Sequence, residues 1–167
     1  MSEPTFVHLH VHSEYSLEDG IIPVKALAKR CAEKNMPAVA ITDHGNLFAL
    51  VKFYNAARSQ GVKPLIGSEI WVHDEGDADR PASLILLRMN KTGYANLSRL
   101  LSRAYLEGHQ QGRPQIAAGW LQQASDGLIA LSAAGQGEIG RALLRRDHAQ
   151  AELLAKRYAD WFPERFY

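Results

Sequence analysis

The segment AVAITDHGNLFALVKFYNAARSQGVKPLIGSEIWV, residues 38–72, contains the pattern that decides the fold. It begins with a short apolar run, residues 38–42, of the kind found in buried strands, and a polar loop follows. A helix is then predicted from about residue 47 to residue 60, with Gly61 as its stop signal, and residues 65–72 are predicted to form the next strand. A strand, a helix and another strand in this order favour a parallel sheet with a helical crossover.

The rest of the 167-residue chain continues this alternation. Residues 6–12 alternate between apolar side chains and His, which predicts a first strand, and an amphipathic helix is predicted from Pro23 to about Asn35. Further strands are predicted at 84–87 and 128–131, and further helices at 117–123, 138–146 and 148–161, with one long helix that opens at 90–93. Five such alternations predict an α/β fold with a parallel sheet, either an open doubly wound sheet or a (β/α) barrel.

Phe166 and Tyr167 look like the start of another strand. A parallel strand needs neighbours on both sides, so an apolar end of this kind is a poor terminus for a domain. We therefore expect residues 1–167 to be the N-terminal part of a longer protein.

Composition narrows the classes of function. Lys plus Arg is 19 and Asp plus Glu is 18, which gives a net charge of +1 and argues against a strongly basic nucleic-acid arm. The single cysteine, Cys31, excludes an intrachain disulfide and a zinc cage of cysteines. No signal peptide and no membrane-spanning run is found, so we expect a soluble, cytoplasmic domain. Arg141, Arg145 and Arg146 cluster near a helix end, where the helix dipole favours them; DNA binding is the alternative, which the net charge disfavours.

The candidate ligands for a metal begin with HLHVH, residues 8–12. His residues two apart on a strand share a face, so the rings of His8, His10 and His12 can converge on one ion. The alternative is a sheet face with solvated His side chains.

Four further residues are candidates: two follow a strand, one lies in a turn and one interrupts a strand. Asp43 and His44 come where a strand passes into a helix, the end at which parallel α/β folds build their sites, although Asp43 can also cap the helix. Asp19 precedes Gly20, as turn residues do. Glu69 interrupts an apolar strand, where a carboxylate is costly unless a metal or an Arg pairs with it.

Together these residues predict hard oxygen and nitrogen ligands at the ends of the first three strands. Such a set suits a cluster of zinc or manganese ions, in which Glu69 can bridge two ions. Two close metals activate a water and hold a phosphate ester, so the residues indicate metal-dependent phosphoester hydrolysis or its remnant. The predicted ligands are His10, His12, Asp19, His44 and Glu69.

The chain resembles the polymerase and histidinol phosphatase (PHP) domain family, and more narrowly the branch at the N-terminus of bacterial DNA polymerase III alpha subunits. The resemblance covers essentially the whole chain and is carried by HLHVHSEYSLEDG, by residues 40–70 and by NKTGYANLSRLLSRAYLEG. It implies a distorted (β/α) barrel, incomplete within these residues, with a trinuclear metal site at one mouth.

The resemblance also assigns roles to the ligands. His10 and His12 match the pair that binds one metal, Asp19 and His44 match ligands of another, and Glu69 matches the bridging carboxylate. Two positions depart from the family pattern, because Ser83 stands where a His opens the fourth strand and Ala134 stands where a Cys is usual. One metal position is therefore expected to be lost, which favours a structural platform over an active nuclease.

The resemblance implies that the parent protein is a DNA-directed DNA polymerase that uses magnesium. It also implies DNA, a proofreading exonuclease subunit and other replisome subunits as partners, and no membrane partner. The chain itself is expected to act as a scaffold and not to polymerise. The alternatives are a free-standing phosphatase of the histidinol-phosphate type and a structural module without metal. The length of the reading frame distinguishes the polymerase from the phosphatase.

Overall fold

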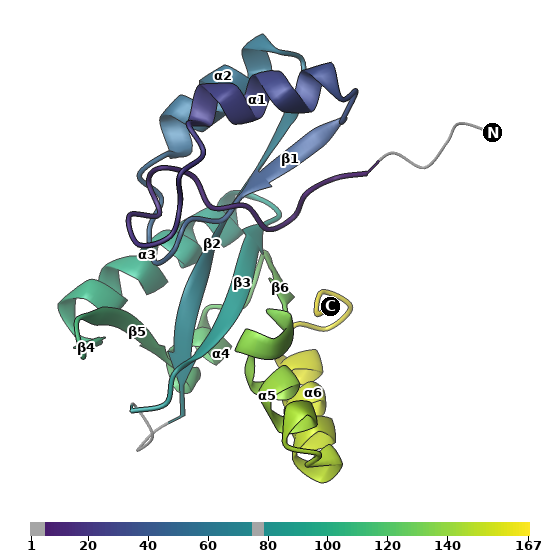
Figure 1. The fold of residues 1–167 in the computed structure, drawn as a ribbon. Helices are drawn as coiled ribbons and strands as arrows, with labels where there is room; N and C mark the ends of the chain where they lie inside the picture. The colour runs from purple at the N-terminus through teal and green to yellow at the C-terminus, as the bar shows by residue number, and fades with distance from the viewer. Residues whose placement is uncertain (1–5, 75–78) are drawn as a thin grey trace. The chain divides into compact units, whose positions relative to one another are not determined.

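The computed structural model describes residues 6–74 and 79–167, which form two compact units, Met1–Ser68 and Glu69–Tyr167. Strand β2, Lys63–His73, passes from the first unit into the second between Ser68 and Glu69. Figure 1 gives the order of the elements along the chain. Each unit is described by itself below.

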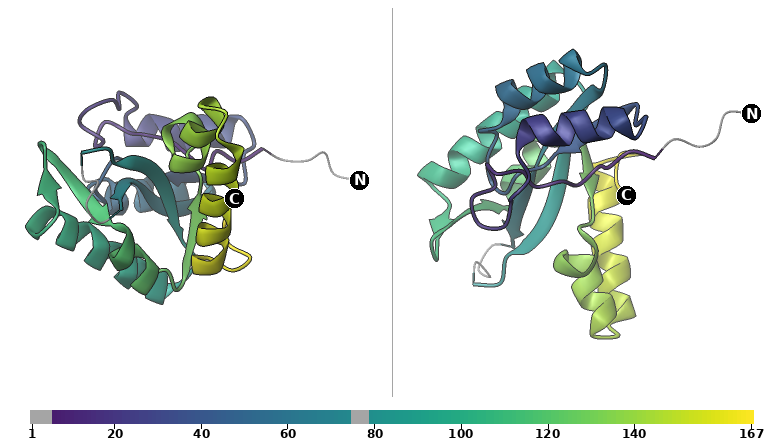
Figure 2. Two further views of the ribbon diagram at one scale, coloured as in Figure 1. Left: turned by 90° about the horizontal axis from the view of Figure 1, so that it is seen from below. Right: turned by 45° about the horizontal axis from the view of Figure 1, so that its top comes forward.

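The first unit contains helices α1, Val24–Glu33, and α2, Leu50–Ser59, strand β1, Ala38–Ile41, and the first half of β2. All four residues of β1 are buried, and β1 pairs with β2 in parallel, from Ala38 opposite Lys63 to Ile41 opposite Ile66. The two helices pack side by side, as Figures 1 and 2 show. The strand–helix–strand prediction for residues 38–72 is therefore confirmed.

The apolar stripe predicted for α1 forms the core of this unit. Val24, Leu27, Ala28 and Cys31 are all buried and join one cluster with Phe53 of α2. The thiol of Cys31 lies in this cluster, and burial raises its pKa.

The predicted strand at residues 6–12 is only partly formed. His8 makes an isolated parallel bridge to Val39, and the carbonyls of His8 and Val11 accept hydrogen bonds from Ala40 (2.8 Å) and Thr42 (2.9 Å). The segment therefore follows the direction of β1 without making a continuous ladder. Its expected apolar face is also incomplete, because Leu9 is 40% exposed.

The second unit contains the rest of β2 and an open sheet with the order β4-β5-β2-β3-β6. Its strands are β3, Ala82–Arg88, β4, His109–Gln110, β5, Arg113–Ala117, and β6, Leu128–Leu131. Its helices are α3, Lys91–Leu106, α4, Ala118–Gln123, α5, Glu138–Leu144, and α6, His148–Trp161, with the short helix η1, Ala134–Gln136, before α5. Helices α5 and α6 lie side by side in both figures.

The sheet of the second unit is mixed, which corrects the prediction of an all-parallel sheet. Strands β2 and β5 are parallel, but β3 and β6 are antiparallel, as are β4 and β5. Only eight residues, 74–81, join β2 to β3, whereas a parallel crossover needs about a dozen or more. Strands β4 and β5 form an antiparallel hairpin, with His109 opposite Pro114 and Gln110 opposite Arg113.

The last residues of the chain align with β6. Phe166 bridges Ala130 in parallel, and Tyr167 donates its amide hydrogen to the Ala130 carbonyl at 3.0 Å. The ring of Phe166 stacks on Tyr158 with centroids 5.1 Å apart. These hydrogen bonds support the prediction that Phe166 and Tyr167 begin another strand.

Candidate metal centre

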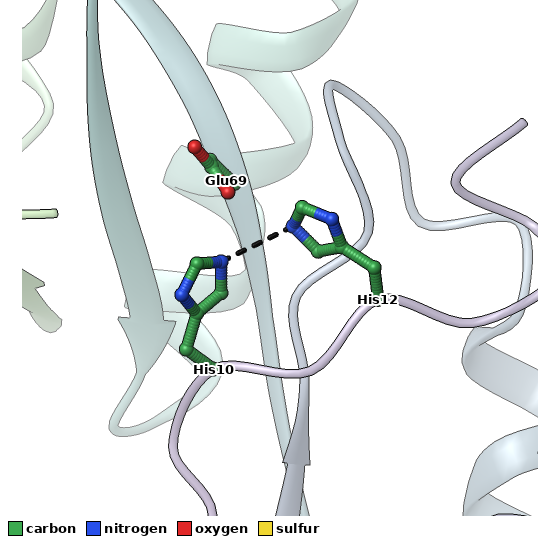
Figure 3. Close-up of side chains that lie close together, drawn as sticks. All are labelled: His10, His12 and Glu69. Atoms are coloured by element: carbon green, nitrogen blue, oxygen red, sulfur yellow. Dashed lines mark hydrogen bonds between the residues drawn. The ribbon is translucent and has the colours of Figure 1, made fainter. Parts of the chain in front are cut away.

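His10 and His12 bring their imidazoles together within the first unit. Their Nε2 atoms are 3.2 Å apart, and the ring centroids are 4.9 Å apart (Figure 3). Two imidazoles on one tetrahedral zinc, with bonds of about 2.1 Å, have nitrogens about 3.4 Å apart. The observed separation therefore suits two ligands of a single ion.

Asp19 fixes the orientation of His12. Nδ1 of His12 lies 2.9 Å from Oδ2 of Asp19, so the carboxylate is placed to accept a hydrogen bond from Nδ1. When the ring is neutral, this tautomer leaves Nε2 with a lone pair for a metal. A histidine that binds a metal through one ring nitrogen usually donates a hydrogen bond from the other ring nitrogen, often to a carboxylate.

His44 completes a second group with His12 and Asp19. One candidate ligand atom from each residue lies within 4.8 Å of those of the other two. Nδ1 of His44 is 4.0 Å from Oδ2 of Asp19, and its ring centroid is 5.4 Å from that of His12. Two imidazoles and one carboxylate form a donor set that zinc and manganese accept.

The carboxyl group of Asp19 is held in its ionised form. Partial burial raises its pKa, but the hydrogen bond from Ser16 (2.8 Å) and the charges and hydrogen bond of the neighbouring histidines outweigh burial and lower the pKa below its ordinary value. A carboxylate must be ionised to bind a metal, so this environment prepares Asp19 as a ligand.

Gly20 is required for this geometry. A Cβ added at Gly20 would lie 1.7 Å from the Ser13 carbonyl oxygen, so the chain must have glycine where it turns back past Ser13. The Asp-Gly turn that the sequence predicted therefore also places the Asp19 carboxylate.

Asp43 holds the loop after His12 through hydrogen bonds from Ser13, and it does not cap helix α2. Its two oxygens accept hydrogen bonds from Ser13, one from the amide (2.6 Å) and one from the hydroxyl (2.9 Å), and the residue is 2% exposed. Burial raises the pKa of Asp43, although the two hydrogen bonds from Ser13 oppose that shift. Helix α2 begins after Ala49 with no side-chain cap, so the capping interpretation of Asp43 is wrong.

Ser13 and Ser16 are supporting residues that the sequence analysis did not single out. Ser13 links the loop after His12 to Asp43, and the hydroxyl of Ser16 donates to Asp19 and accepts from the His44 amide at 3.1 Å. Both serines are buried. Their spacing after HLHVH is the only available sequence signal, and alone it does not distinguish them from turn residues.

His8 lies apart from both ligand groups that the described residues form. Its ring contacts Phe6 edge-on, with centroids 4.7 Å apart, and the residue is exposed. The prediction that three histidines on one strand face converge is therefore reduced to two, because the segment is not a regular strand.

Glu69, Ser83 and Ala134 belong to the second unit. Glu69, also labelled in Figure 3, is the first residue of that unit and is 5% exposed within β2. Ser83 is 6% exposed in β3, and Ala134 opens η1. A Cβ added at Gly137 would lie 3.2 Å from the Ser83 carbonyl oxygen and 1.8 Å from that of Ser132, so Ser83 lies beside the turn that contains Ala134.

Comparison with known proteins identifies the family. The model of the PHP domain matches residues 8–167. The chain belongs to the PHP domain family. DNA polymerase III alpha subunits are its relatives: it is 48% identical to the one from Pseudomonas aeruginosa over 98% of its own length. Identity is 45% for Vibrio cholerae and 43% for Escherichia coli, each over the full chain. The chain spans 14% of the length of each of these relatives.

Solved structures confirm the fold of this PHP chain. A protein from Bifidobacterium adolescentis described as a metal-dependent phosphoesterase aligns with a TM-score of 0.55 at 12% identity, over 94% of this chain and 84% of that one. An amidohydrolase from Chromobacterium violaceum aligns with a TM-score of 0.54 at 20% identity, over 88% of this chain and 73% of that one. These similarities support the predicted α/β fold of the PHP type with a sheet that is not closed. Among the described residues, no helix is both long and apolar enough to cross a membrane.

Proposed function

We propose that this chain is the N-terminal PHP region of the alpha subunit of a replicative DNA polymerase III. The observation that supports this most strongly is the 43–48% identity to such subunits over at least 98% of the chain. Relatives about seven times as long also favour the polymerase over a free-standing histidinol-phosphate phosphatase. Nucleotidyl transfer, with its magnesium ions, is assigned to the part of those proteins that this chain does not span.

Primer extension tests this assignment. The complete polypeptide should extend a primed template with magnesium, and residues 1–167 alone should not, whichever metal is supplied. A complete polypeptide that hydrolyses histidinol phosphate and does not extend the primer would favour the phosphatase. Extension by the 167-residue chain would show that the polymerase site has been placed wrongly.

Within this chain, we propose a metal centre held by His10, His12, Asp19, His44 and Glu69. The nitrogen–nitrogen separation of His10 and His12 and the His12–Asp19–His44 group support the first four. Support for Glu69 comes from the family resemblance and from its place directly after Ser68, whose hydroxyl donates to the Asp43 carbonyl at 2.7 Å. Zinc and manganese are the ions that these donors suit, and such an ion lowers the pKa of bound water for attack on a phosphate ester.

The two departures from the family pattern support a platform with an incomplete cluster. Alanine offers no ligand atom at position 134, and a serine hydroxyl at position 83 is a weaker ligand than an imidazole. Fewer ligands leave one ion position weakly held. We therefore assign this PHP domain a structural role in preference to nuclease activity.

Metal analysis tests the centre directly. His12→Ala should bind zinc at least tenfold more weakly than the unchanged protein, because it removes a ligand and the partner of Asp19. His148→Ala, at the exposed start of α6, serves as the matched control and should bind zinc normally. Equal zinc affinity in all three proteins would refute the proposed site.

The proposed partners are DNA, through the polymerase, and a proofreading exonuclease subunit docked on this domain, with cytoplasm as the location. The exonuclease role rests on the family resemblance. Gel filtration of the purified exonuclease with the complete polypeptide, and with one that lacks residues 1–167, tests it. Co-elution with both would show that the exonuclease docks elsewhere.

A further inference from the structure

A pocket of about 410 Å³ lies in the second unit, and none of its lining residues is assigned above to a metal. Basic side chains predominate among its polar lining residues, which are Asp74, Arg80, Glu138, Arg141, Arg145 and Gln150. They come from the end of β2, the segment before β3, helix α5 and the start of α6.

The two acidic residues of the pocket, Asp74 and Glu138, both pair with one arginine, Arg157. Arg157 of α6 donates to both carboxylate oxygens of Asp74, at 2.8 and 3.1 Å, and also to the carboxylate of Glu138. The hydroxyl of Tyr158 donates to the same Glu138 oxygen at 2.8 Å. Burial lowers the pKa of Arg157, but the charge of Glu138 and the hydrogen bond to Asp74 outweigh it and raise the pKa, so Arg157 stays charged.

With Arg157 included, four guanidinium groups outnumber the two carboxylates, which leaves a net charge of +2 around the pocket. Arg141 and Arg145 are four residues apart, at the end of α5 and its C-cap, and therefore share a helix face. Nη1 of Arg141 donates to the Pro81 carbonyl at 2.8 Å, which fixes this guanidinium beside the segment that carries Arg80. Both Arg80 and Arg145 are exposed.

Other acidic side chains near these elements already accept hydrogen bonds from neighbouring residues. Asp147, which precedes α6, accepts the Gln150 amide at 3.0 Å as its helix cap, and Asp79 accepts the side chain of Gln111 at 2.8 Å. The helix dipole favours Arg141 and Arg145 at the end of α5, but it does not explain Arg80, which lies on another segment. Like charges gathered in one pocket repel one another unless an anion lies between them.

We propose that this pocket binds a phosphate group. Three guanidiniums and the Gln150 amide supply planar, paired hydrogen-bond donors, which match the oxygens of a doubly charged phosphate better than a single carboxylate. A pocket of this volume holds the phosphate and part of the group esterified to it. The same chemistry serves a free phosphate or phosphate ester and a phosphate of a nucleic-acid strand.

Calorimetric titration of inorganic phosphate into the complete polypeptide tests the site, with EDTA present so that no divalent ion contributes. Arg80→Gln/Arg145→Gln removes two charges and leaves the hydrogen bond between Arg141 and Pro81 intact. Lys91→Gln/Arg99→Gln changes the net charge of the same unit equally and serves as the control, since both residues are exposed and outside the pocket lining. The pocket variant should weaken phosphate binding at least tenfold, and the control should stay within twofold of the unchanged protein.

Two outcomes would overturn the proposal. One is that the unchanged protein does not bind phosphate at about 10 mM, roughly the weakest affinity of interest. The other is that both double variants lose phosphate affinity equally. A second titration, with an oligothymidylate present, identifies the source of the phosphate. Displacement of phosphate from the unchanged protein but not from the pocket variant indicates a nucleic-acid strand. Phosphate binding that the oligothymidylate leaves unchanged indicates a free phosphate or a small phosphate ester.

Discussion

Removal of the Asp43 carboxylate should loosen the loop that carries His12. Asp43 accepts two hydrogen bonds from Ser13, at 2.6 and 2.9 Å, and Ser13 has no exposed surface. Asp43→Ala leaves both donors buried without their acceptor, at a cost of about 1–3 kcal/mol for each. The hydroxyl can rotate to another acceptor, so we count only the amide and take the middle of its range, about 2 kcal/mol, as the loss for the loop.

Hydrogen exchange followed by mass spectrometry measures this loss locally. At about 1.4 kcal/mol for each factor of ten, a loss of 2 kcal/mol speeds exchange of the amides of residues 11–16 roughly 30-fold. Asp43→Asn keeps one acceptor for the Ser13 amide and should speed exchange far less. Asp126→Ala, at an exposed position of the second unit, should leave these amides unchanged. If Asp43→Ala exchanges no faster at residues 11–16 than the Asp126 variant, the supporting role of Asp43 is wrong.

Three further expectations follow from the site. The folded-state pKa of Asp19 lies below its ordinary value, so the stability that this carboxylate contributes is present above the ordinary value and is lost as pH falls from there through the folded-state pKa. Asp19→Asn should therefore flatten the acid limb of a plot of stability against pH, measured as the midpoint of unfolding at each pH. An unchanged acid limb would contradict this expectation. Zinc affinity should fall as the solution becomes more acidic, because protons compete with the metal for the ligand atoms; a flat profile in isothermal titrations at several pH values would show that the histidines are not ligands. The double variant Ser83→His/Ala134→Cys should raise the metal content of the complete domain, measured by elemental analysis, and a count that stays at the original value would refute the account of a lost metal.

The sequence alone predicted most of the helices and strands and the types of candidate ligand. The period of apolar residues predicted α1 from Val24 to Cys31 and the buried strand β1, because one buried face leaves a regular pattern along a chain. Polar residues placed directly after buried strands pointed to His44, and His10 and His12 were visible as an alternating pair. These inferences depend on neighbours in sequence, which a single chain shows.

Only the tertiary structure decided the direction of the later strands and the roles of the supporting residues. Strand β6 pairs antiparallel to β3 through contacts between residues 85–88 and 128–131, and no local pattern encodes such a pairing. Asp43 looked like a helix cap, yet its acceptor capacity is taken up by Ser13, thirty residues earlier in the chain. Arg80 meets Arg141 and Arg145 in one pocket only because Pro81 lies against α5. Contacts between distant segments depend on how whole elements pack. The periodicity of one segment does not show which other segment it will contact.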